Sequence, residues 1–131
     1  MFDFITPGRA AAVLLANTLV WKLYMALVWR LGKISQARTK EEIANIKASS
    51  RFVNDSSAQL NEAEWTPPLL AALLFLAVRG ASAPVASGLA VYGSVAYPVL
   101  RILVSNRLAP LGSIPRFVAL GMLTLAVYNA L

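Results

Sequence analysis

Four apolar segments dominate this 131-residue sequence, over residues 10–29, 65–78, 81–104 and 117–131. A helix needs about 20 mainly apolar residues to cross the hydrocarbon core of a bilayer. Only 14% of the residues are charged, whereas a soluble domain has about 25%. Segments of this length and composition indicate an integral membrane protein.

The fold that these segments predict is an all-α, four-helix transmembrane bundle in a single domain. The second segment is short, so we expect its helix to begin near Ser56, with polar first turns at the headgroup level. Tight connections near residues 79–84 and 106–115 make consecutive helices antiparallel neighbours. We expect the four helices at about residues 8–33, 56–79, 81–106 and 114–131. Together they form a single domain over residues 1–131.

The connection over residues 31–55 is the one long polar region. Thr39 followed by Glu42 has the spacing of a capping box, which predicts a short helix over about 40–48. Basic residues gather in this connection and around the one near 106–115, whereas only Arg9 and Arg79 lie on the opposite side. The positive-inside rule then predicts that both basic connections face the cytoplasm or its organellar equivalent, with both termini opposite. The pattern fits the endoplasmic reticulum, another organelle or the bacterial inner membrane.

Cysteine and histidine are both absent from the sequence. This absence excludes disulfides, cysteine nucleophiles and Cys/His metal sites. The six acidic residues are not spaced as a metal-binding set, so we expect no metal. The basic residues flank apolar segments without interleaved aromatics, so we expect the lipid bilayer, and no nucleic acid, as a partner.

Small residues mark the third segment. Ala86, Ala90 and Ser94 repeat every four residues, and such a face lets helices approach closely. Pro98 is expected to kink this helix one turn before Arg101.

Four charged residues are expected at the same membrane face, each near the end of a helix: Arg30, Glu64, Arg101 and Arg116. Guanidinium groups bind carboxylates in bidentate fashion, so this ring is a candidate anion site. The alternative is that flanking arginines extend to the headgroups. That alternative is favoured for Arg30, and a functional role for Arg101, which has apolar neighbours on both sides.

Lys22 interrupts the first apolar segment eight residues before Arg30. A lysine at this depth costs a few kcal/mol unless it reaches polar surroundings. Two interpretations are equally open: its ammonium extends to the membrane surface, or it pairs with Glu62 or Glu64.

The segment 58–68 carries the densest set of polar groups beside an apolar run. Gln59, Asn61 and Glu64 lie within one and a half helical turns, which suggests that they face a common volume. We expect Asn61 and Glu64 to face the bundle interior or a subunit interface, because an unpaired carboxylate is unstable in hydrocarbon.

These residues resemble a known family. The segment Ala58-Gln59-Leu60-Asn61-Glu62-Ala63-Glu64-Trp65 with Pro68, the later Arg101, and Ser113-Ile114-Pro115-Arg116 look like the motifs of the MAPEG family. This family contains microsomal glutathione transferases, eicosanoid synthases and a non-catalytic scaffold protein. The resemblance covers nearly the whole chain.

The resemblance implies a homotrimer that binds glutathione between neighbouring subunits near the cytosolic face. It implies that Gln59, Asn61 and Glu64 hold glutathione, that Arg101 supports the site, and that Arg116 is catalytic and stabilises the thiolate. The implied activity is that of a glutathione transferase or peroxidase on a lipophilic electrophile.

Three positions depart from the family pattern. Ser57 stands where the motif begins with arginine, and Val104 and Leu108 stand where tyrosines follow the third-helix arginine. These departures keep a second hypothesis open, in which the chain is a non-catalytic membrane scaffold or an accessory subunit of a larger membrane complex.

Overall fold

The computed structural model describes residues 5–131, which form helices and contain no strand. The elements in chain order are α1 (Pro7–Tyr24), the π-helix η1 (Met25–Leu31), the 3₁₀ turn η2 (Ile34–Gln36), α2 (Lys40–Ala48), α3 (Ser50–Val78), α4 (Pro84–Val99), the π-helix η3 (Leu100–Val104), the 3₁₀ turn η4 (Asn106–Leu108) and α5 (Pro110–Ala130).

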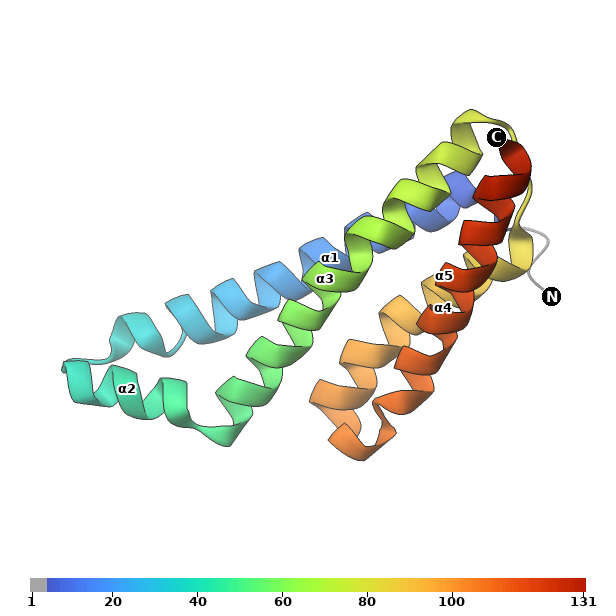
Figure 1. Cartoon of the computed structure of the whole chain (residues 1–131). Helices are drawn as coiled ribbons and strands as arrows, with labels where there is room; N and C mark the ends of the chain where they lie inside the picture. The colour runs from blue at the N-terminus through green and yellow to red at the C-terminus, as the bar shows by residue number, and fades with distance from the viewer. Residues whose placement is uncertain (1–4) are drawn as a thin grey trace.

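The long helices run along one another, with α3 beside α1 and α4 beside α5 (Figure 1). The beginning of α1 and the end of α5 lie at the same end of the molecule, and α2 lies at the opposite end. Within residues 5–131, three helical stretches are long and apolar enough to cross a membrane: Pro7–Gln36, Pro84–Val104 and Asn106–Ala130. The predicted all-helical fold is confirmed for these residues, whereas α3, the fourth expected span, is not among the three candidates.

Local sequence signals set the helix starts. The Thr6 hydroxyl accepts a hydrogen bond from the Arg9 amide at 3.3 Å, and Pro7 occupies the first turn, where its missing N–H costs nothing. The Thr39 hydroxyl accepts from the Glu42 amide at 3.1 Å, so α2 forms where the capping pattern predicted it. The Glu42 carboxylate accepts from the Arg38 amide at 2.6 Å, one residue outside the cap.

Two helices begin earlier than the sequence predicted. Helix α3 starts at Ser50, capped by the Ser49 hydroxyl, which accepts from the Phe52 amide at 3.3 Å. Helix α5 starts at Pro110, so Arg116 lies inside this helix and is fully buried. Arg116, which was expected near the start of a helix beginning at about residue 114, therefore lies more than one turn inside α5.

An apolar core fills the half of the bundle nearer the termini. It contains buried leucines from three helices: Leu14, Leu69, Leu73, Leu76 and Leu123. The small-residue face of α4 is also buried, as predicted, at Ala86, Ala90 and Ser94. Large apolar side chains on α1 and α5 point outward instead, which suits contact with lipid tails.

Helices α4 and α5 are held at very short distance by glycines. A Cβ atom at Gly112 would lie 2.4 Å from the Tyr97 backbone nitrogen, and one at Gly93 would lie 2.7 Å from the Arg116 Cγ. Because real Cβ atoms do not approach other atoms this closely, any larger residue would separate the two helices. This contact brings the α5 arginine against the α4 backbone.

Candidate functional site

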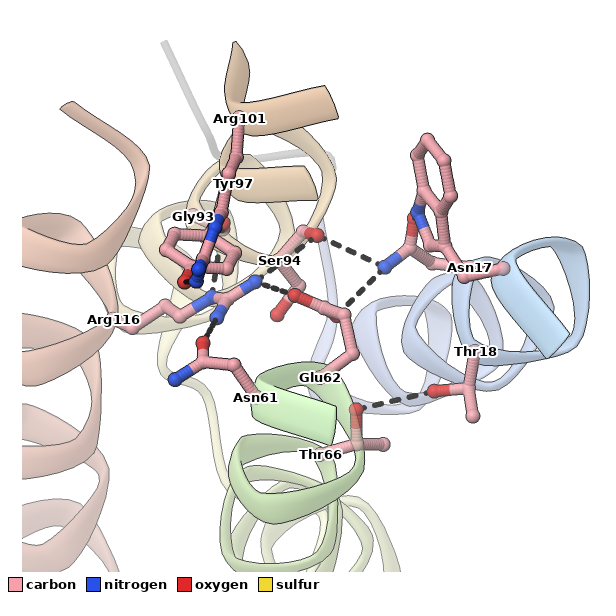
Figure 2. Close-up of polar contacts among 11 residues, drawn as sticks. Asn17, Thr18, Asn61, Glu62, Thr66, Gly93, Ser94, Tyr97, Arg101 and Arg116 are labelled. Atoms are coloured by element: carbon pink, nitrogen blue, oxygen red, sulfur yellow. Dashed lines mark hydrogen bonds and ion pairs between the residues drawn. The ribbon is translucent and has the colours of Figure 1, made fainter. Parts of the chain in front are cut away.

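Arg116 lies at the centre of the bundle. Its Nε donates to the Gly93 carbonyl at 3.0 Å, Nη1 donates to the Asn61 Oδ1 at 2.9 Å, and Nη2 donates to the Ser94 carbonyl at 3.3 Å (Figure 2). Its guanidinium stacks over the Tyr97 ring, 4.5 Å from the centroid. The side chain is completely buried.

Glu62 provides the counter-charge. Its carboxylate forms an ion pair with Nη2 of Arg116 and accepts a hydrogen bond from the Asn17 Nδ2 at 3.0 Å. The same Asn17 nitrogen donates to the Ser94 carbonyl at 2.9 Å, and the Asn17 oxygen accepts from the Trp21 Nε1 at 3.1 Å. This central network, which we define as Asn17, Asn61, Glu62, Ser94 and Arg116, joins α1, α3, α4 and α5 (Figure 2).

The central network supplies acceptors to most of the Arg116 guanidinium. A guanidinium has five N–H donors, and four of them meet two backbone carbonyls, an amide and a carboxylate among the described residues. A buried ion pair with such partners fixes a single arrangement of helices, and loss of one partner leaves an uncompensated charge. In this geometry the Arg116 side chain is fully buried and is not accessible to a ligand.

A second buried carboxylate lies toward the α2 end. Asp55, on α3, accepts from the Tyr24 hydroxyl at 2.7 Å and from the Trp29 indole at 3.0 Å. Trp29 belongs to η1 and is almost fully buried. These bonds fasten η1 to α3.

Arg101 lies beside the central network and outside it. Its Nε donates to the Asn54 Oδ1 at 3.1 Å, the Asn54 Nδ2 donates to the Arg101 carbonyl at 3.2 Å, and its Nη1 donates to the Tyr97 hydroxyl. Tyr97 therefore separates Arg101 from Arg116, with its ring against one guanidinium and its hydroxyl bonded to the other. Arg101 is half-buried, so part of it stays accessible.

Gln59 lies in a groove on the α1 side of α3. Two hollows of about 440 and 380 Å³ share Met25, Arg30 and Gln59; Lys22 lines the first hollow and Lys47 the second. We call these hollows the basic groove. Among residues 5–131, no carboxylate lines either of them. The basic groove therefore presents three cations to whatever fills it.

Glu64 points away from the basic groove and from the central network. It is exposed on the outward side of α3, whereas Glu62 is buried. At 100° per residue, Gln59, Asn61 and Glu64 leave the helix axis in directions of about 0°, 200° and 140°. The expectation that these three side chains face one volume is therefore not met within one chain. Asn61 does face the interior, as expected.

Lys22 does not pair with either glutamate. Its side chain is exposed along the basic groove and makes no hydrogen bond or ion pair with another described residue. Glu62 takes Arg116 instead.

The sequence-based predictions gave Glu62 only a possible pairing with Lys22 and gave Asp55 no role, although the sequence contains the signal for the burial of both acids. The buried positions of α3 recur every three or four residues, at Leu76, Leu73 and Leu69. The same steps continued toward the N-terminus reach Thr66, Glu62, Ala58 and Asp55, all of them buried. In α3 the helical period of the buried positions identifies the inward-facing acid, whereas the distance in sequence between an acid and a motif residue does not.

Among the described residues, no group of three or more acidic side chains could hold a metal ion. Comparison of the chain with protein-family models, with curated proteins and with solved structures gave no match.

Proposed function

We propose that the chain is a multi-pass membrane protein of MAPEG-like architecture, with α1, α3, α4 and α5 all crossing the bilayer in a homotrimer. The burial of Glu62 and Asp55 supports a membrane position for α3, because both acids turn toward protein partners. The outward residues Leu60, Leu74 and Val78 suit lipid. Glu64 is the polar exception on this face, and a neighbouring subunit would shield it.

We further propose that the basic groove binds glutathione and that the protein transfers it to a lipophilic electrophile. The observation that carries this proposal is the composition of the basic groove. Gln59, which the family resemblance implicates in glutathione binding, lies there with Lys22, Arg30 and Lys47 and with no carboxylate. Glutathione carries two carboxylates, and charge-assisted hydrogen bonds to lysine and arginine are the strong kind.

The chemistry would come from the bound tripeptide, since the chain has no cysteine. The thiol gives its proton to water, and the sulfur forms a bond to an electrophilic carbon of a substrate that enters from the lipid. The bond that breaks at this carbon gives its electron pair to a leaving group or, in an epoxide, to the ring oxygen, which then takes a proton from water. Cations near the sulfur favour the thiolate. The groove cations are open to the ligand, whereas Arg116 is not, so we assign charge stabilisation to the groove and a positioning role to Arg116.

A second candidate function rests on the central network. Because four of the five N–H donors of the buried Arg116 meet acceptors within the chain, this arginine is held in place without a ligand. A scaffold or accessory subunit that kept the fold without glutathione chemistry has this property.

A binding titration separates the two functions. Protein purified in an uncharged detergent is titrated with glutathione by calorimetry, and thiolate absorbance is followed in the ultraviolet. Binding in the millimolar range or tighter, weakened roughly tenfold by Arg30→Met, supports the transferase. Arg38→Met is the matched control, because Arg38 is exposed outside the basic groove.

Absence of binding at ten millimolar glutathione would reject the transferase and favour the scaffold. Native mass spectrometry of the same preparation tests the homotrimer, and a chain that stays monomeric in mild detergent and in nanodiscs would reject it.

A further inference from the structure

Lys22 is the one residue of the basic groove whose position is hard to explain by packing. It lies eight residues before Arg30 on the same continuous helical stretch, roughly 10–12 Å deeper in the membrane. It is exposed and has no partner among the described residues. A lysine held at that depth without a partner is unfavourable, and such residues commonly mark a ligand path.

The π-helix η1 places Lys22 and Arg30 along the same hollow. In an uninterrupted α-helix, residues eight apart differ by about 80° in direction. The wider turns of η1, with hydrogen bonds from residue i to i+5, reduce that difference, and both side chains line the first hollow of the groove. Gln59 from α3 faces the same hollow.

The rise along the helix between Lys22 and Arg30 is close to the length of a tripeptide. Three fully extended residues span at most about 10–11 Å, close to the rise between Lys22 and Arg30. A ligand with a carboxylate at each end would satisfy both cations together, and its centre would lie beside Gln59. A single small anion would leave one cation without a partner.

We infer that Lys22 is the deep anchor of the basic groove and binds one terminal carboxylate of a glutathione-sized peptide that has a carboxylate at each end, while Arg30 binds the other. This inference rests on the proposed function and adds a specificity-determining residue that the family motif does not contain. Lys22 thereby selects for ligand length and for a second carboxylate.

A lipid phosphate is the other source of negative charge at this site. Phosphates lie at the headgroup level, near Arg30, whereas Lys22 lies about two helical turns deeper. A peptide with a carboxylate at each end can therefore bind both Lys22 and Arg30, whereas a headgroup phosphate lies near Arg30 alone.

The test compares two ligands on three proteins by calorimetry in an uncharged detergent. The ligands are glutathione and its monoethyl ester at the glycine carboxylate, which has nearly the same size and one carboxylate fewer. The proteins are wild type, Lys22→Met and Arg30→Met. We expect each substitution to weaken glutathione binding roughly tenfold. We expect the ester to be insensitive to one substitution, the one that removes the cation facing the missing carboxylate.

The control variant is Lys40→Met, which removes the same charge from an exposed position on α2 outside the basic groove. Lys22→Met should fold normally, because no described residue depends on this ammonium. Thermal unfolding checks that point.

Three outcomes would overturn the inference. In the first, Lys22→Met binds glutathione as wild type does while Arg30→Met does not; the proposed function then stands without the deep anchor. In the second, both substitutions weaken both ligands equally, which indicates only a general positive field. In the third, Lys22→Met releases phosphatidylglycerol from nanodiscs without changing glutathione affinity, which assigns the lysine to lipid. If wild type binds neither ligand, the proposed function itself fails.

Discussion

At the scale of single residues, the molecule separates two neighbouring glutamates by environment. Glu62 is buried against Arg116, whereas Glu64, two residues later, is exposed on the opposite side of α3. The difference follows from the helix: two residues correspond to a turn of about 200°. Identical carboxyl groups therefore have different consequences when they are changed.

We predict that Arg116→Met destabilises the folded chain by about 3–5 kcal/mol, because it leaves the Glu62 carboxylate buried without a counter-charge. The double variant Glu62→Gln/Arg116→Met should be more stable than Arg116→Met alone, since it removes the stranded charge. Denaturation in mixed detergent micelles, followed by circular dichroism, measures both values.

Glu64→Gln is the matched control for Glu62→Gln, with the same chemical change at an exposed site. It should change the stability of the isolated chain by less than about 0.5 kcal/mol. Equal losses at the two positions would contradict the assigned burial.

At the scale of elements, the contact between α4 and α5 depends on glycine. The backbone of Gly112 lies against that of Tyr97, and no Cβ atom fits between them. Helices inside a bilayer gain no hydrophobic free energy when they associate, so close van der Waals packing of this kind stabilises their contact. It also brings Gly93 and Ser94 within reach of the arginine above them.

We predict that Gly112→Ala destabilises the protein by about 1–3 kcal/mol, as overpacking does. Gly121→Ala, on the same helix α5, should be neutral or slightly stabilising, because a Cβ there has open space and alanine is the better helix former. Thermal unfolding of the two variants side by side checks the prediction. A Gly112→Ala protein as stable as Gly121→Ala would show that α4 and α5 are not this close.

The elements were more predictable than the contacts between them. Hydropathy and the cap at Thr39 predicted the helices and the position of α2. The start of α3 was missed because polar residues in its first turns are satisfied by tertiary partners, as with Asp55 and Tyr24. The start of α5 was missed because Gly112 is held in the helix by close packing against Tyr97. Glu62 and Arg116 are distant in sequence, so the spacing of neighbouring residues could not predict that they pair.

At the scale of the whole molecule, the last turn of α5 is held to the connection between α3 and α4. The Arg79 guanidinium donates from Nε and Nη2 to the Ala130 carbonyl, at 3.0 and 2.7 Å. This contact ties the connection after α3 to the last turn of α5, at the end of the molecule opposite α2. The arrangement agrees with a chain whose termini share one side of the membrane.

We predict that single cysteines introduced at Asn45 and at Leu131 react with an impermeant thiol reagent from opposite sides of sealed vesicles. The chain has no native cysteine, so the background is clean. Asn45 is exposed on α2, which lies in the basic connection over residues 31–55. Labelling of both positions from the same side would contradict the topology.

The central ion pair also sets the order in which the protein can be completed during synthesis. Asn61 and Arg116 are 55 residues apart, so a ribosome working at 5–20 residues per second makes α5 roughly 3–11 s after this part of α3. Until then Glu62 has Asn17 from the first helix beside it, but no positive charge. In the nascent chain the Glu62 carboxylate therefore has no counter-charge until α5 has been synthesised. We expect α3 to take its final position in the bundle only at that point.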